Sequence, residues 1–107
     1  MVTEGKEQAA VDEEAIIQAI QRVEHPEINC TLVELGMVKD IQVSGNQVSL
    51  KLVLPFLGIP AVIRDHLIRS LQQAIADFGA KLKVQVAEMT PAERQRFFAL
   101  EQQNWKA

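Results

Sequence analysis

The most constraining feature of this 107-residue chain is a change of hydrophobic period across residues 37–54. Apolar and polar side chains alternate there on both sides of the pair Gly45-Asn46. Alternation with a period of two places every second side chain on the same face of a strand, and a Gly-Asn pair favours a tight turn. The stretch therefore predicts a β-hairpin with one buried face.

Helical spacing precedes the hairpin and returns after it. Asp12 can accept hydrogen bonds from the free amides of a helix start, and we expect a helix from there to about Val23. Pro26 disfavours helical geometry at His25 and ends this helix. A second helix is predicted to open at Pro60 and to stop at Gly79. Its expected core stripe consists of Ile63, Leu67, Leu71, Ala74 and Phe78.

The remainder of the chain predicts one more strand and one more helix. Alternation in residues 81–86 predicts the strand, and Thr90-Pro91-Ala92-Glu93 fits a capping box at the start of a helix toward Asn104. The fold class is thus α+β, a two-layer α-β-β-α-β domain with a small mixed three-stranded sheet and a C-terminal helix. We expect a disordered tail over 1–10, the domain over 11–89 and the C-terminal helix within 90–107.

Composition narrows the classes of function. The net charge is −3, and the nine basic side chains of residues 35–107 are interleaved with six acidic ones, which argues against a nucleic-acid surface. No apolar run approaches the roughly 20 residues that span a membrane. We therefore expect a cytoplasmic protein that binds neither nucleic acid nor membrane.

The single cysteine, Cys30, lies five residues after His25, one of only two histidines. A nucleophilic role would need activation by His25 or His66, and an inert, buried thiol is the alternative. One Cys and two His do not complete a tetrahedral zinc site within a chain. An iron-sulfur cluster takes cysteine thiolates, so a cluster or metal ion would have to be shared between two chains through Cys30 and His25.

Two segments together resemble a known family. Residues 23–28 (Val-Glu-His-Pro-Glu-Ile) and residues 33–41, which include Leu35-Gly36, are followed by a hairpin and a loop ending in Pro60. This combination resembles the iron-sulfur cluster assembly domain family of the SufT and PaaD type, and most closely the cysteine-free domain that precedes Mrp/ApbC-type ATPases. Its structural motif residues here are Pro26, Leu35, Gly36 and Pro60.

The sequence departs from the family pattern at one important position. Many members carry Cys-Pro at the start of the second helix, and that cysteine is the residue usually connected with cluster handling. Here the dipeptide is Ile59-Pro60. Cys30 does not match the family cysteine, so the resemblance transfers no role to it.

The leading hypothesis is a non-catalytic accessory protein in iron-sulfur cluster assembly, with no cofactor of its own. It would act by contact with a carrier ATPase, a scaffold or a recipient apoprotein. The expected partner surface consists of His25, Glu27, Cys30, Phe56 and Ile59. One alternative is a homodimer that binds a cluster or metal through Cys30, with His25 as a further ligand. Another is an interaction module unrelated to clusters, docking through Phe97, Phe98 and Trp105.

Overall fold

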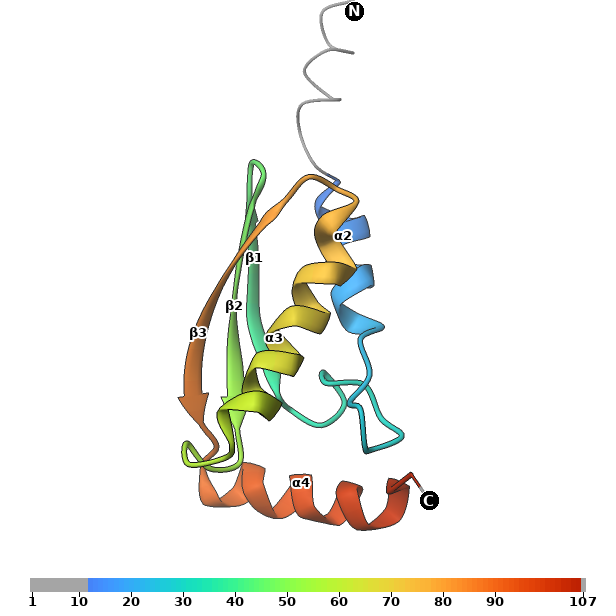
Figure 1. Cartoon of the computed structure of the whole chain (residues 1–107), viewed down its shortest axis with the longest axis vertical. Coiled ribbons are helices and arrows are strands. Elements are labelled where there is room, and N and C mark those ends of the chain that lie inside the picture. Colours follow the sequence, from blue (N-terminus) through green and yellow to red (C-terminus); the bar gives the residue numbers. More distant parts are fainter. Residues whose placement is uncertain (1–11, 107) are drawn as a thin grey trace, which may run out of the picture.

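The computed structural model describes residues 12–106, so the predicted tail lies outside the described residues. Helices and strands follow one another in the order α-β-β-α-β-α, which confirms the predicted fold class (Figure 1). The elements are α2 (Glu13–Gln21), β1 (Val38–Ser44), β2 (Gln47–Leu54), α3 (Ala61–Ala76), β3 (Lys81–Glu88) and α4 (Pro91–Asn104).

The three strands form one mixed sheet in the order β1-β2-β3. β1 and β2 are the predicted antiparallel hairpin, with Gly45 at a φ of 60° in its turn. β2 and β3 are parallel and pair along their full length, from Gln47 with Lys81 to Leu54 with Glu88. A parallel neighbour needs a crossover connection, and α3 supplies it.

β1 is less regular than the alternation predicted. Its register with β2 shifts between Lys39 and Gln42, where Asp40 takes a φ of 54°. A residue in this left-handed conformation produces a β-bulge, which leaves one residue of the strand unpaired and bends it. The bulge was not predicted, because an aspartate within a strand gives no clear signal for it.

The core lies between the sheet and the pair α2 and α3 on one of its faces (Figure 1). Ile16 and Ile20 of α2 are fully buried, as predicted. α2 ends at Gln21, two residues earlier than expected. The chain then returns on itself, since Val23 accepts a hydrogen bond from the amide of Leu32 at 2.9 Å and Glu24 bridges with Thr31. Backbone pairing, and not Pro26 alone, therefore ends the helix.

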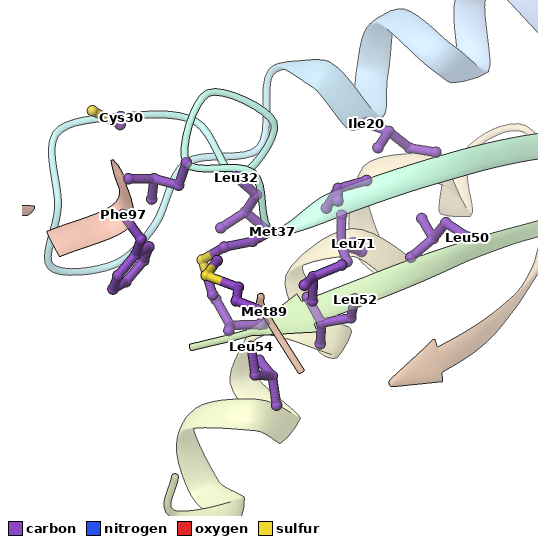
Figure 2. Close-up of a cluster of buried hydrophobic side chains, with 14 of the residues drawn as sticks. Ile20, Cys30, Leu32, Met37, Leu50, Leu52, Leu54, Leu71, Met89 and Phe97 are labelled. Carbon is purple, nitrogen blue, oxygen red and sulfur yellow. The ribbon is translucent and has the colours of Figure 1, made fainter. Parts of the chain in front are cut away.

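The C-terminal helix α4 lies across one end of the sheet (Figure 1). Its predicted capping box is present: the Glu93 amide donates to Thr90 Oγ1 at 3.2 Å, and the Thr90 amide donates to Glu93 Oε1 at 2.9 Å. Phe97 is buried and joins the core cluster with Met37 and Met89 (Figure 2). Phe98 and Trp105 remain exposed, so only part of the aromatic surface packs on the domain.

Candidate interaction surface

The turn from His25 to Cys30 is held by its own backbone and by the His25 ring. The amide of His25 donates to the carbonyl of Cys30 at 3.0 Å, and the amide of Glu27 donates to His25 Nδ1 at 3.0 Å. His25 as a whole is 6% exposed. Burial lowers the pKa of His25, Lys106 and His66 act in the same direction, and the Glu27 carboxylate opposes them. His25 therefore serves the turn as a neutral acceptor.

Cys30 is 9% exposed and lies at the margin of the core cluster, apart from Leu50 and Leu71 (Figure 2). Burial raises the pKa of its thiol, and the Glu34 and Glu24 carboxylates add to the effect. A raised pKa keeps the sulfur protonated, whereas a nucleophile or a metal ligand must be a thiolate. The burial and the raised pKa of Cys30 therefore favour the inert, buried thiol over a nucleophile or a metal ligand.

The donor set near Cys30 does not suit a metal ion or a cluster within one chain. Within residues 12–106, no three His, Cys, Asp or Glu side chains come together in a group able to hold a metal ion. His25 Nδ1 already accepts the Glu27 amide, and a cluster requires several thiolates. The residues of this turn therefore do not fit a resident cluster, and the shared-site hypothesis would need ligands from elsewhere.

Residues 104–106 are hydrogen-bonded to the same turn. The amide of Asn29 donates to the carbonyl of Asn104 at 2.7 Å, and the amide of Lys106 donates to the carbonyl of Glu27 at 3.0 Å. Lys106 Nζ also donates to the carbonyl of His25 at 3.2 Å. These bonds attach the turn to the C-terminal end of α4. The side chains of Glu27, in the turn, and of Trp105, directly after α4, remain exposed.

The loop from Pro55 to Pro60 is attached to the first half of α4. Arg94 Nε donates to the carbonyl of Pro55 at 2.9 Å, and its guanidinium carbon lies 4.7 Å from the centroid of the Phe56 ring. The Phe56 ring packs on Phe98, with 5.9 Å between ring centroids. Phe98 also meets the buried Phe97 edge-on, at 5.6 Å. Contacts between three aromatic rings, Phe56, Phe98 and Phe97, therefore connect the exposed loop with the core.

Ile59, where the resemblance implies a cysteine in many members, lies directly before Pro60, the N-cap residue of α3. Its side chain is half-buried and packs against the core cluster. An aliphatic side chain at this helix start cannot ligate a metal or form a thiolate. The predicted fold-specifying residues behave differently: Leu35 is buried, and Gly36 takes a φ of 76° at the entry to β1.

The predicted partner residues therefore separate into two groups. The turn and the loop lie at the same end of the domain, but the loop contacts Arg94 and Phe98 while the turn bonds to residues 104–106. Glu27 and Phe56 are exposed, Ile59 is half-buried, and His25 and Cys30 are buried. The sequence interpretation missed Arg94, although its position four residues before Phe98 places both on one face of a helix.

Comparison with known proteins decides the family. The model of the family described as iron-sulfur cluster assembly protein matches residues 13–92. The chain belongs to this family. A curated relative, the iron-sulfur cluster carrier protein of Synechocystis sp., is 29% identical over 83 residues, which are 76% of this chain and 23% of the relative. The resemblance inferred from the sequence is thus confirmed, and α4 lies almost wholly beyond the matched residues.

This iron-sulfur cluster assembly domain matches under a quarter of the length of that carrier protein. The match covers α2, the sheet and α3, and so includes both the turn and the loop described above. Within residues 12–106, none of the helices combines the length and the apolar character needed to cross a membrane.

Proposed function

We propose that this chain is a non-catalytic accessory protein that acts in iron-sulfur cluster assembly by contact with a carrier ATPase, a scaffold or a recipient apoprotein. The observation that carries the proposal is an exposed apolar patch formed by Phe56, Leu57 and Phe98, which we call the loop-helix patch. Phe56 and Leu57 are 46% and 57% exposed, respectively. Phe56 and Phe98 contact one another, and Leu57 is the next residue of the loop. Neighbouring exposed apolar side chains of this kind are typical of protein-binding surfaces.

The patch is held in shape before any partner arrives. Arg94 fixes the loop backbone at Pro55, and Phe98 supports the Phe56 ring from α4. Preorganised aromatic side chains lose little conformational entropy on binding, which favours affinity. Aromatic residues, phenylalanine included, are also enriched at protein interfaces.

Direct cluster chemistry is not part of the proposal. The cluster would be the cargo of the partner, because Cys30 is buried with a raised pKa and residue 59, where the resemblance implies a cysteine, is an isoleucine. Protein contact then remains as the way in which this chain could influence assembly.

The proposal is tested by cluster transfer without oxygen. A purified iron-sulfur cluster carrier protein is loaded with a cluster, and transfer to an apo-ferredoxin is followed with and without this chain. We expect the chain to bind the carrier or the acceptor and to change the transfer rate. Phe56→Ser and Phe98→Ser should each weaken binding at least about tenfold.

Val62→Ser is the matched control, since Val62 is 74% exposed on α3 and has no part in the loop-helix patch. Circular dichroism establishes that each variant is folded. Equal binding by all three variants would contradict the proposed surface. Binding to neither protein, with no effect on transfer, would contradict the accessory function itself.

A further inference from the structure

The outer edge of β3 carries backbone groups that β2 does not use. Lys81 donates its amide to the carbonyl of Asn46 at 2.8 Å, and Met89 donates to Leu54 at 2.8 Å. In a parallel pair, successive residues of a strand direct their amide and carbonyl groups alternately to its two sides. The even-numbered residues Leu82, Val84 and Val86 therefore point their amides and carbonyls away from β2. Among residues 12–106, the sheet has no strand beyond β3.

The two edges of the sheet are built differently. The β1 edge is interrupted by the bulge at Asp40, a device that natural proteins use to prevent pairing with another chain. β3 has an unbroken register of eight residues, contains no proline and lies at the margin of the sheet (Figure 1). Such an edge is a template for β-augmentation.

The side chains of β3 indicate which strand would fit. Leu82 and Val84 are half-buried on the core side, and Val86 is 39% exposed although it belongs to the same alternating set. The residues between them, Lys83 and Gln85, are exposed. A partner strand therefore needs apolar side chains on one face and polar ones on the other, with the same spacing. β3 itself has this pattern.

We propose that β3 pairs antiparallel with β3 of a second copy, with Val84 on the two-fold axis, to give a continuous six-stranded sheet. In this register Leu82 lies opposite Val86, and the residues with outward amides and carbonyls face one another. On the other face Lys83 lies opposite Gln85, so no two lysines are paired. A shift by two residues toward the C-terminus would set Leu82 against the charged Glu88, which cross-strand pairing disfavours.

The dimer is independent of the proposed function and of the shared-cluster hypothesis. Residues 22–37, which contain Cys30, lie on the side of the domain away from β3 (Figure 1). Pairing through β3 would therefore hold the two Cys30 thiols far apart. A dimer that shared a cluster through Cys30 would use a different surface and would not respond to changes in β3.

The test measures the mass of the full chain by sedimentation over a series of concentrations. We expect a dimer that Val86→Lys and Val86→Pro weaken at least about tenfold, because each change occurs twice across the two-fold axis. Lysine places a charge among apolar neighbours, and proline removes an outward amide without breaking a bond to β2. Val62→Lys is the matched control and should leave the dimer unchanged.

Amide hydrogen exchange identifies the edge directly. In the wild-type dimer the amides of Leu82, Val84 and Val86 should exchange more slowly than in Val86→Lys. The amides of Lys83 and Gln85 bond to β2 and should be protected in both proteins. A monomer at every concentration would overturn the proposal, whether or not the edge amides are protected. A dimer unaffected by both Val86 variants, or with edge amides that exchange equally in wild type and variant, would also overturn it.

Discussion

The substitution Arg94→Ala tests how α4 is attached to the rest of the domain. Arg94 Nε and Nη2 donate to the carbonyls of Pro55 and Met89 at 2.9 and 3.2 Å, and the guanidinium group covers the ring of Phe56. One change in α4 therefore removes two hydrogen bonds and a cation-π contact. The pairing of Arg94 with Glu88 is longer, at 3.7 Å, and is partly exposed, so it contributes little.

The expected loss of stability follows from these contacts. A hydrogen bond from a charged donor contributes about 1.5–3 kcal/mol, and the 26% exposure of the side chain favours the lower value. An exposed cation-π contact adds about 0.5–1 kcal/mol. Because the three contacts share one side chain, they are not additive, and we expect a total loss of about 2 kcal/mol. That corresponds to a decrease in Tm of about 8–16 °C.

Urea denaturation followed by circular dichroism measures the free energy of unfolding of each variant. Arg69→Ala is the control, since Arg69 is an exposed arginine on α3, and its change should stay within about 0.5 kcal/mol. A double-mutant cycle with Phe56→Ala should give a coupling energy of about 0.5–1 kcal/mol for the cation-π contact. A loss below about 0.5 kcal/mol in Arg94→Ala would refute the attachment of the loop through this side chain.

Three further predictions concern the turn and the entry to β1. The depressed pKa of His25 means that its contribution to stability is present above pH 6.5, its unfolded value, and is lost as the pH falls through the folded value. His25→Gln should remove this part of the pH dependence of unfolding, and His66→Gln should keep most of it, because His66 has the smallest effect of the groups that lower the pKa of His25. The Cys30 thiol, buried and with a raised pKa, should react with iodoacetamide at pH 7.5 at least about tenfold more slowly in the folded chain than in urea; equal rates would contradict its burial. Gly36→Ala should cost about 1 kcal/mol in urea denaturation because of its φ of 76°, although no atom lies within 4 Å of the added Cβ. Gly58→Ala, which has equal space and no positive φ, should cost nothing measurable.

The parts of the fold that were predictable depend on local physical chemistry. The capping box at Thr90 is decided within a few residues and is predictable from sequence. Gly79 takes the predicted left-handed conformation, with a φ of 69°, although α3 ends three residues earlier, at Ala76. The core stripe of α3 was found only in part. Leu67, Leu71 and Ile75 are buried at a spacing of four, whereas the predicted Ala74 is half-buried. The angle at which α3 packs on the sheet decides whether Ala74 or its neighbour Ile75 is buried.

The parts that were not predictable depend on contacts between distant residues. The end of α2 at Gln21 is decided by Leu32, and the burial of His25 and Cys30 follows from packing that the sequence does not reveal. The hydrogen bonds between the turn and residues 104–106 join segments more than 70 residues apart. No periodicity or motif carries such information, so sequence alone predicts His25 and Cys30 on a partner surface, whereas the structure buries both.

The location of α4 explains why the family alone cannot define the contact surface of this domain. The matched residues end at 92, yet the Pro55–Pro60 loop is bonded to Arg94 and the His25–Cys30 turn is bonded to residues 104–106. Any partner that approaches this end of the sheet would meet Phe98 and Trp105 together with Phe56. The proposed surface therefore combines a loop of the shared fold with a helix beyond the match, and its specificity would depend on that helix.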